Sequence, residues 1–196
     1  MRRRAEQVDQ TRQRIVEAAV ELHGSVGPAA TTIAAIADRA GVTRLTVYRH
    51  FPDQTALFGA CSAHWASRQQ LPDPGAWSGI GGPAARLRAG LADLYRFYRA
   101  GAGMLTHIHR DLAALPEPHQ QALRDGDTLI RDLLTAPFGG AGDEYRQLRA
   151  VIGHATSFWT WRSLCLDQGL TETEAIEVMT GMVLAITPAP QAKAAR

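Results

Sequence analysis

The sequence predicts an all-α chain in which a small N-terminal helix-turn-helix precedes a larger helical body. Three features favour this fold class. Apolar residues recur at steps of three and four along most of the chain, glycines and prolines interrupt that pattern, and residues suited to helix N-caps precede several apolar stretches. The chain has 196 residues, 45% of them hydrophobic, which is enough for a buried core.

A first helix is expected over residues 9–24, because its apolar side chains share one face at helical spacing. These side chains belong to Ile15, Ala18, Ala19 and Leu22. We expect this face to support the two short helices that follow the loop SVGPAA.

The N-terminus is basic although the whole chain is nearly neutral. Twenty-one basic and 19 acidic residues give a formal charge of +2, so overall charge does not indicate nucleic-acid binding. Only Glu6 and Asp9 oppose the arginines of the first 14 residues, which are Arg2, Arg3, Arg4, Arg12 and Arg14. This segment is either an arm that reaches a DNA backbone or minor groove, or a solvated, frayed end.

Residues 31–51, TTIAAIADRAGVTRLTVYRHF, predict two short helices joined at Gly41. Thr32 and Thr43 are placed as their N-caps. The apolar side of the first helix is formed by Ile33, Ile36, Ala37 and Ala40, and Val47 and Phe51 turn the second toward the core. This arrangement is typical of a helix-turn-helix.

The second helix leaves a mixed set of side chains for an outside partner, namely Arg44, Leu45, Thr46, Tyr48, Arg49 and His50. A helix in the DNA major groove uses such a mixture: Arg reads guanine edges, small or apolar groups contact thymine methyls, and hydroxyl, imidazole or guanidinium groups contact phosphates. An ordinary helical hairpin is the alternative interpretation.

The order of segments in this region closely resembles the TetR (tetracycline-repressor) family of bacterial regulators. A helix is followed by GVTRLTVYRHF and then by PDQTALF at the start of another helix. The motifs cover about residues 10–60; beyond them only length, helical character and domain order agree. The expected domains are a DNA-binding domain over residues 1–52 and an effector-binding and dimerisation domain over 53–187. Residues 188–196, rich in Pro and Ala, are expected to be a disordered tail.

The resemblance implies roles for individual side chains. Arg44, Leu45 and Thr46 would face bases, whereas Thr43, Tyr48 and His50 would lie close to the phosphate backbone. The residues expected at the DNA interface are Thr32, Thr43, Arg44, Leu45, Thr46, Tyr48, Arg49, His50 and Gln54.

Two of these positions depart from common family choices. Gln54 stands where many family members have a Lys that donates to phosphate, so the backbone clamp is expected to be weaker. Leu45 replaces a small residue or Pro, and it favours contact with a thymine methyl.

In the body, Asp53 is the expected cap of a fourth helix that continues toward Gln70. Residues 71–83 contain too many prolines and glycines for a helix and predict a mobile connection. Trp77 lies within this connection, either as a plug that closes a pocket or as an anchor on the core.

Five further helices are expected after this connection. The first covers 83–100 and is ended by the glycines at 101 and 103, and the second covers 104–115. The third lies between Pro118 and Pro137, and its buried side is formed by Leu123, Leu129, Ile130, Leu133 and Leu134. The fourth is a long segment from an Asp143 cap to about Gln168, and the fifth is the final helix. Thr171 and Glu174 have the spacing of a capping box at the start of that final helix.

The last helix carries an apolar surface wider than one intramolecular stripe requires, which predicts a partner helix. We expect a homodimer through the two C-terminal helices, packed as a four-helix bundle, as the family resemblance also implies. A monomer that buries both helices in its own core is the alternative. The expected interface residues are Val151, Ala155, Phe158, Arg162, Val178, Met179, Met182, Val183 and Ile186.

Aromatic and polarizable side chains gather in helices that family members wrap around an effector pocket, and they favour an apolar or aromatic effector. Core packing explains them equally well. The candidate effector-binding residues are Tyr95, Tyr98, Met104, His107, Phe158, Trp159 and Trp161. Arg110 beside the histidines is the one place in the body where an anionic group could meet a cation.

Other functional classes lack signals. His107 and His109 are two residues apart and point to different faces of a helix, so no metal site and no cofactor are expected. The sequence has no nucleophile elbow, phosphate loop or HExxH motif, which leaves an enzyme or a structural adaptor as alternatives without support. Two cysteines, no signal peptide and no long apolar run predict a cytoplasmic protein outside the membrane.

The sequence therefore predicts a one-component regulator, a repressor that binds a pseudo-palindromic, double-stranded DNA operator as a homodimer. A small effector would release it by shifting the fourth helix, so that the spacing of the two recognition helices no longer fits the operator.

Overall fold

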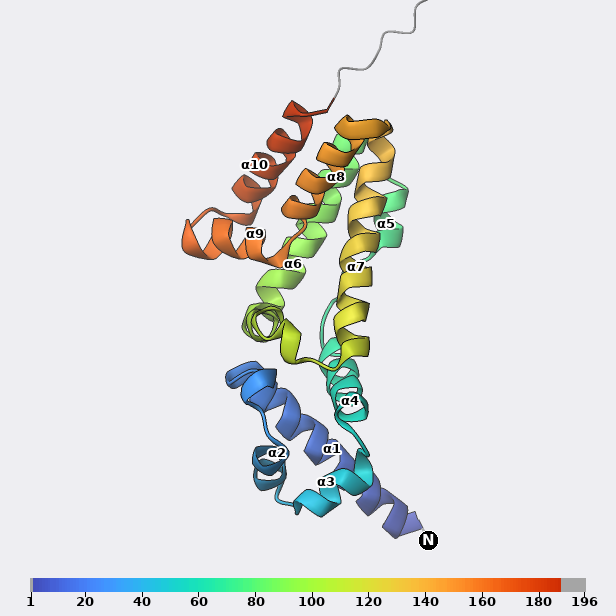
Figure 1. Ribbon diagram of the computed structural model, residues 1–196, viewed down its shortest axis with the longest axis vertical. Coiled ribbons are helices and arrows are strands. Elements are labelled where there is room, and N and C mark those ends of the chain that lie inside the picture. The colour runs from blue at the N-terminus through green and yellow to red at the C-terminus, as the bar shows by residue number, and fades with distance from the viewer. Residues whose placement is uncertain (1, 188–196) are drawn as a thin grey trace, which may run out of the picture. The chain divides into compact units, whose positions relative to one another are not determined.

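The computed structural model describes residues 2–187, and these residues form helices and no strand (Figure 1). The all-α prediction is therefore confirmed, while the expected tail at 188–196 lies outside the described residues. The chain divides into two compact units. Unit one contains the residues up to 71 together with 100–123, and unit two contains 72–99 and the described residues from 124 onward.

Unit one is built around its first helix. Helix α1 (Arg2–Ser25) contacts α2 (Ile33–Ala40) and α4 (Gln54–Ala66), and α2 contacts α3 (Arg44–His50). A 3₁₀ turn (Pro28–Ala30) connects α1 to α2. The core is apolar and includes Ile15, Ala19, Ile36, Ala37, Val47, Phe51, Leu57 and Cys61. The predicted stripes of the first three helices are confirmed, although Leu22 and Ile33 are only partly buried at the margin of this core.

Helix α1 begins earlier than residue 9. Its backbone is helical from Arg2, because Arg, Ala, Glu and Gln all have good helix propensity and nothing in this stretch breaks a helix. The basic segment is thus an extension of α1 in its backbone, and whether it contacts DNA stays a prediction.

Helix α6 (Pro83–Arg110) is continuous through the glycines that were expected to end it. The separate helix predicted over 104–115 is wrong, because only a 3₁₀ turn (Leu112–Ala114) follows α6. A Cβ on Gly101 would come within 2.9 Å of the Trp65 ring of α4. The absence of a side chain at Gly101 therefore lets α4 and α6 approach each other, and it does not mark a helix end.

The first part of α6 belongs to unit two and its end to unit one, and α7 (Glu117–Thr135) is likewise divided between the units. The expected domain boundary after residue 52 does not coincide with these units. The reason is that α4 packs on α1 and that residues 100–123 also join unit one.

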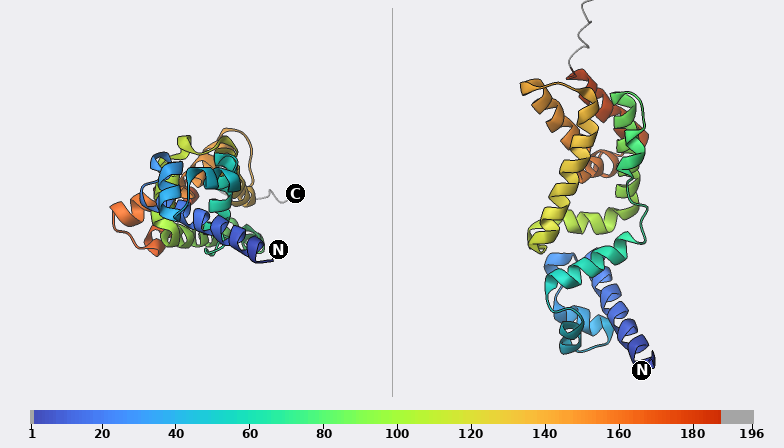
Figure 2. Two further views of the ribbon diagram at one scale, coloured as in Figure 1. Left: turned by 90° about the horizontal axis from the view of Figure 1, so that it is seen from below. Right: turned by 90° about the vertical axis from the view of Figure 1, so that its right-hand side faces the viewer.

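Unit two contains the remaining helices: α5 (Pro74–Ser78), α8 (Gly142–Ala155), α9 (Phe158–Arg162) and α10 (Glu172–Ala185). A 3₁₀ turn (Ala136–Phe138) follows α7, and a single π-helical turn (Ser163–Asp167) follows α9. Helix α10 lies beside α8 in the views of Figures 1 and 2. The core includes Leu87, Leu91, Leu94, Leu134, Leu148, Ile152 and Val183. Leu129, expected to be buried, is 56% exposed.

The connection before α6 contains α5, where it was expected to be mobile throughout. Trp77 of α5 is only 3% exposed, and its Nε1 donates to Asp93 Oδ2 of α6 over 3.1 Å. The backbone N–H of Asp73 donates to the same oxygen over 2.7 Å. Of the two interpretations of Trp77, the structure supports an anchor on the core.

The long helix expected over 143–168 is interrupted at Thr156 and Ser157. Tyr95 Oη and Tyr98 Oη donate to the carbonyl oxygens of Ala155 and Thr156 over 2.9 and 2.7 Å. Ser157 then caps α9 by accepting from Trp159 N. Because side chains of α6 occupy carbonyls that helix continuation would use, the chain can turn here.

Helix α8 also begins differently from the prediction. Its N-cap is Ala141, and Asp143 lies in the first turn, where a carboxylate still interacts favourably with the helix dipole. The capping box of α10 is confirmed, since Thr171 and Glu174 each accept the other's backbone N–H.

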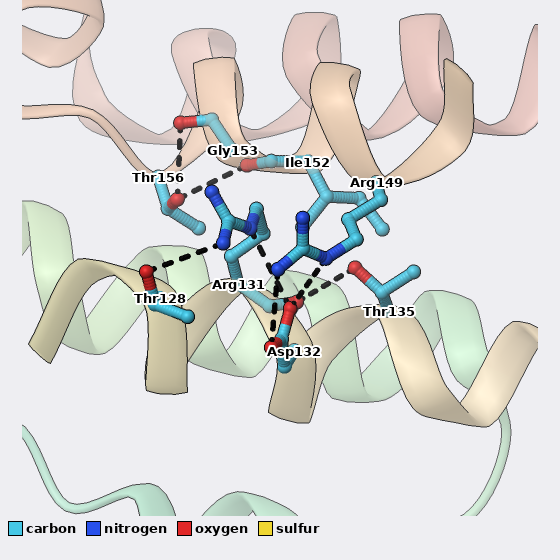
Figure 3. A network of polar contacts seen from close by, with 8 residues as sticks. All are labelled: Thr128, Arg131, Asp132, Thr135, Arg149, Ile152, Gly153 and Thr156. Atoms are coloured by element: carbon cyan, nitrogen blue, oxygen red, sulfur yellow. Dashed lines mark hydrogen bonds and ion pairs between the residues drawn. The ribbon is translucent and has the colours of Figure 1, made fainter. Parts of the chain in front are cut away.

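Charged side chains tie α7 to α8, as Figure 3 shows. Arg149 Nε of α8 donates to Asp132 Oδ1 of α7 over 2.7 Å. Within α7, Arg131 Nη2 donates to Thr128 Oγ1 over 3.2 Å. The hydrogen bond from Arg149 holds the pKa of Asp132 below its ordinary value. No sequence pattern indicates the pairing of Arg149 with Asp132, because the two residues are distant along the chain.

Candidate nucleic-acid interface

The helix-turn-helix forms as the sequence predicts. Thr32 Oγ1 accepts Ala35 N over 3.1 Å, and Thr43 Oγ1 accepts Thr46 N over 3.2 Å, so both threonines cap their helices. Gly41 ends α2 with φ of 65°, a left-handed conformation that glycine adopts without steric cost. Two short helices are thereby fixed on either side of one glycine.

The inner face of α3 attaches this helix to the core of unit one. Val47 and Phe51 are buried, and the Arg12 guanidinium of α1 lies 4.7 Å from the centre of the Phe51 ring. This distance is within the range of a cation–π interaction. One arginine of the basic segment therefore stabilises the end of α3, a role that the sequence did not indicate.

The outer face of α3 presents the predicted side chains. Leu45 is 70% exposed, Arg44, Tyr48 and Arg49 are also exposed, and Thr46 and His50 are half-buried. At the edges of α3, exposed positions are occupied by Thr32, Thr43 and Gln54. All nine residues expected at the DNA interface belong to unit one, on α3, its N-cap and the starts of α2 and α4.

The charge on this surface is positive because its arginines lack acidic partners. Among the described residues, Arg44 and Arg49 take part in no ion pair or hydrogen bond. Arg39 of α2, in contrast, is paired with Glu21 of α1. Two free guanidinium groups beside an exposed leucine can contact phosphates, base edges and a thymine methyl.

A second polar site holds the loop between α1 and α2, and we call it the loop clamp, formed by Val26, Gly27, Ala29, Arg110 and Asp111. Arg110 Nη2 donates to the Val26 carbonyl over 2.9 Å, and Ala29 N donates to Asp111 Oδ2 over 3.1 Å. Arg110 Nε also pairs with Asp111 Oδ1 over 2.7 Å. Arg110, which the sequence offered as a partner for an anionic group, is thus paired with the carboxylate of Asp111.

Gly27 makes the loop clamp possible. Its φ of 94° is unfavourable for residues with a side chain, and a Cβ there would collide with Arg110 Nη2 and Asp111 Oδ2. The hydrogen bond from Arg110 holds the pKa of Asp111 below its ordinary value. Both partners of the clamp therefore stay charged near neutral pH.

The candidate effector residues do not form one group. In unit two, the Tyr98 ring packs against Phe158 at 5.5 Å and Trp161 at 6.0 Å, and all three are buried beside Tyr95. Burial raises the pKa of both tyrosines, whose hydroxyls already donate to backbone carbonyls. The Trp161 Nε1 is buried without a hydrogen-bond partner among the described residues.

The other three candidates differ in position. Trp159 is exposed on α9, although its ring lies 5.3 Å from the Phe158 ring, and Met104 and His107 belong to unit one. Met104 packs toward Gly24 at the end of α1, and His107 Nδ1 is buried without a hydrogen-bond partner among the described residues. Five members of the expected set therefore lie together in unit two: the cluster of Tyr98, Phe158 and Trp161, with Tyr95 and Trp159 packed against it.

The expected dimer residues also separate by burial. Ala155, Phe158, Met179 and Val183 are buried within unit two, so their side chains are not available on the surface of the protomer. They are buried in the unit in which α8 contacts α10, and a role for them in a dimer interface stays a prediction. The exposed members are Val178, Met182 and Ile186, while Val151 and Arg162 are half-buried.

Membrane spans and metal clusters are both absent from residues 2–187. No helix in this range is both long and apolar enough to cross a membrane. In the same range, no three His, Cys, Asp or Glu side chains gather in a way that would hold a metal ion.

Comparison with known proteins places the helix-turn-helix in a family. Residues 15–61 match the sequence model of the bacterial regulatory proteins of the tetR family. The chain is 39% identical over 57 residues to the HTH-type transcriptional regulator AcrR of Shigella flexneri, and 43% identical over 60 residues to the HTH-type transcriptional regulator TtgR of Pseudomonas putida. These matches span 29% and 31% of this chain but only 26% and 29% of the two relatives.

Solved structures resemble the chain over most of its length. A putative fatty acid metabolism regulator of Clostridium perfringens has a TM-score of 0.59 at 16% identity, covering 90% of this chain and 99% of the other. The TetR family regulator PfmR of Thermus thermophilus has a TM-score of 0.56 at 18% identity, covering 91% and 100%. At these identities the likeness establishes the fold alone.

Proposed function

We propose that this chain, whose residues 15–61 match the tetR family model, is a transcriptional repressor of that family. In this proposal it binds a pseudo-palindromic operator as a homodimer and leaves it when a small effector binds. The observation that carries the proposal is the outer face of α3. It combines two unpaired guanidinium groups with a 70% exposed leucine on a helix whose inner face is buried. This mixture of cationic and apolar groups is complementary to the phosphates, base edges and thymine methyls that a major groove presents.

The N-caps and the buried inner face of α3 hold the side chains of its outer face in place, and we assign each of them a role by its position. Arg44, Leu45 and Thr46, at the start of α3, contact base edges. The remaining positions contact phosphates and set the register of the protein on DNA. They are Thr32, Thr43, Tyr48, Arg49, His50 and Gln54.

Dimerisation rests on α10. Val178, Met182 and Ile186 follow one another at steps of four on this helix and its C-cap, and all three are exposed in the protomer. An exposed apolar row of this kind on a helix is stabilised when a second copy covers it. Pairing of α8 and α10 with their counterparts would form a four-helix bundle and place two copies of α3 on one operator.

The effector is expected to be apolar or aromatic and to bind in unit two, near the cluster of Tyr98, Phe158 and Trp161. The unpartnered Trp161 Nε1 offers one hydrogen-bond donor in otherwise apolar surroundings. Helix α6 carries Tyr98 and ends at Arg110 in the loop clamp. A shift of α6 on effector binding would therefore alter the loop that precedes α2.

The direct test is DNA retardation with fragments of the chain's own genome, followed by footprinting beside its own gene. We expect protection of two half-sites about one helical turn apart, 10–10.5 base pairs from centre to centre. Retardation must disappear when Arg44 and Arg49 are both replaced by Ala, since neither side chain supports the fold. Equal retardation by this double variant would show that α3 is not the DNA-reading element.

A further inference from the structure

Unit one contains a cavity of about 490 Å³ that is lined in part by α3, and we call it the head cavity. Its outer rim is formed by Arg44, Tyr48 and Gln54, and its deeper side by His23 and Phe58. This volume falls within the range of about 300–1,000 Å³ that is usual for small-molecule sites. All of its lining residues belong to unit one, so the cavity lies within the DNA-reading unit itself.

The deep side of the head cavity is aromatic and fixed in place. The rings of His23 and Phe58 lie 5.4 Å apart, and His119 packs on Phe58 at 4.7 Å. His119 Nε2 lies 3.2 Å from the Thr55 carbonyl, which holds that ring in turn. A planar ring can pack against aromatic side chains that are already ordered without a large entropic cost.

The residues that line the head cavity carry one positive charge and no negative charge. Arg44 is the only residue of the lining with a formal charge, because burial lowers the pKa of His23 to about 4 and leaves its imidazole neutral at neutral pH. Arg44, Tyr48 and Gln54 make no hydrogen bond or ion pair within the described part of the chain. One free cation, a phenol and an amide therefore stand at the rim of an aromatic cavity.

The side walls leave space because they carry small or rigid residues. Pro28 and Ala29 come from the turn before α2, and Ala114 and Pro116 come from the connection between α6 and α7. Ala29 is fixed by its hydrogen bond to Asp111 in the loop clamp. The part of the wall formed by Ala29 is thus set by the same contacts that position the loop.

We propose that the head cavity binds a planar aromatic monoanion, such as an aromatic carboxylate, whose ring lies against Phe58 and His23 and whose anionic group pairs with Arg44. This ligand site is separate from the effector site proposed in unit two. Arg44 and Tyr48 are one helical turn apart on α3, so both face an occupant of the cavity. Because Arg44 cannot contact a base edge and this anion at once, the ligand competes directly with DNA.

The probe is 2-naphthoate, titrated by calorimetry into the full chain without DNA. One site per chain with a dissociation constant of about 0.1–1 mM is expected for a compact ligand of this size. The neutral analogue 2-naphthylmethanol should bind about tenfold or more weakly, because it loses the charge-assisted pair with Arg44. Inorganic phosphate should not bind measurably. Equal binding of phosphate and 2-naphthoate would mean that the rim alone holds anions, and it would overturn the aromatic site.

A pair of matched variants locates the site. Ala114→Phe fills the cavity from its wall and should weaken 2-naphthoate binding at least about tenfold. Ala113→Phe, at the neighbouring exposed position outside the lining, should leave it unchanged. Arg44→Gln provides a second variant on the exposed surface and should remove the preference for naphthoate over naphthylmethanol. Unchanged binding in Ala114→Phe and Arg44→Gln would place the ligand elsewhere and refute the proposal.

Competition with DNA gives an independent measurement and rests on the proposed DNA binding by α3. The apparent dissociation constant for an operator fragment should rise in proportion to 2-naphthoate concentration with no limit. An effector acting from unit two would instead give a plateau, because its coupling free energy is finite. A plateau would therefore exclude the head cavity as the site of inhibition. Naphthoate binding without DNA binding would contradict the proposed function and leave the cavity in place.

Discussion

We expect base recognition to depend most on Arg44, because its guanidinium is exposed at the start of α3 and has no partner among the described residues. Replacing Arg44 by Ala should cost about 1–3 kcal/mol in operator binding and relax the preference at one base pair. Fluorescence anisotropy on the operator and its single-base variants measures both effects. Arg39→Ala is the matched control, since Arg39 is paired with Glu21 and should leave base preference unchanged. Equal preference in the Arg44 variant would remove this residue from the base-reading set.

Gln54 allows a gain of function to be tested. It is exposed at the first position of α4 and makes no hydrogen bond or ion pair among the described residues. Gln54→Lys should add one phosphate contact, so that the slope of log affinity against log salt becomes steeper by about 0.9. Gln54→Met has a similar length without charge and should keep the original slope. A Lys variant with an unchanged slope would show that this position does not reach the backbone.

Gly27 tests the loop clamp at the level of one residue. Gly27→Ala combines an unfavourable φ with collisions against Arg110 and Asp111. Gly82→Ala is a matched control, because Gly82 has a φ of 83° but nothing within 4 Å of its added Cβ. In urea unfolding, the control should lose about 1 kcal/mol and Gly27→Ala about 2–3 kcal/mol. Equal losses would mean that the clamp yields without cost.

Residue roles could be predicted where their cause is local. The caps at Thr32, Thr43 and Asp53 follow from side chains that bond to backbone three residues away. The loop clamp could not be predicted, because Val26 and Arg110 are 84 residues apart and neither carries a motif. Sequence patterns identify a contact only when both partners lie within a few residues.

At the scale of elements, the starts of helices were easier to predict than their continuity. The glycines of α6 have the composition of a helix end, yet Gly101 serves the close packing of Trp65. Conversely, no glycine or proline marks the break between α8 and α9, which two tyrosines of α6 stabilise from outside. Tertiary contacts override local propensity at both places.

Tyr98 provides the test of that break. Tyr98→Phe keeps the ring packed on Phe158 and Trp161 but leaves the carbonyl of Thr156, a buried residue, without its donor. The free energy of unfolding should fall by about 1–2 kcal/mol. Tyr145→Phe is the control, because the Tyr145 hydroxyl makes no hydrogen bond among the described residues. If both variants have the stability of the parent chain, the carbonyl is satisfied in another way, for example by water.

At the scale of the whole molecule, the all-α character of the chain was predictable, but the composition of its two units was not. Residues 100–123 return to unit one, because the end of α6 and the start of α7 pack on α1 and α4. Amphipathic patterns state that a helix has a buried face without saying which element covers it. For the same reason, the sequence could not separate residues that are buried inside one chain, such as Ala155 and Val183, from exposed ones such as Met182.

The exposed row of α10 allows the proposed dimer to be tested without harm to the protomer. Met182 is 49% exposed, so Met182→Glu should leave the fold of one chain unchanged. In a two-fold interface through α10, it would place a carboxylate on each copy in apolar surroundings, which strongly disfavours association. Light scattering at micromolar concentration should then give a monomer, and operator affinity should fall because the two half-sites are no longer bound by one particle.

The matched control is Leu129→Glu on α7, which changes an exposed leucine of 56% exposure outside α8 and α10. This variant should remain dimeric and bind the operator as the parent chain does. If the parent chain itself scatters as a monomer, the homodimer proposal is wrong. If Leu129→Glu dissociates and Met182→Glu does not, the two-fold interface lies on α7, and the apolar row of α10 needs another partner.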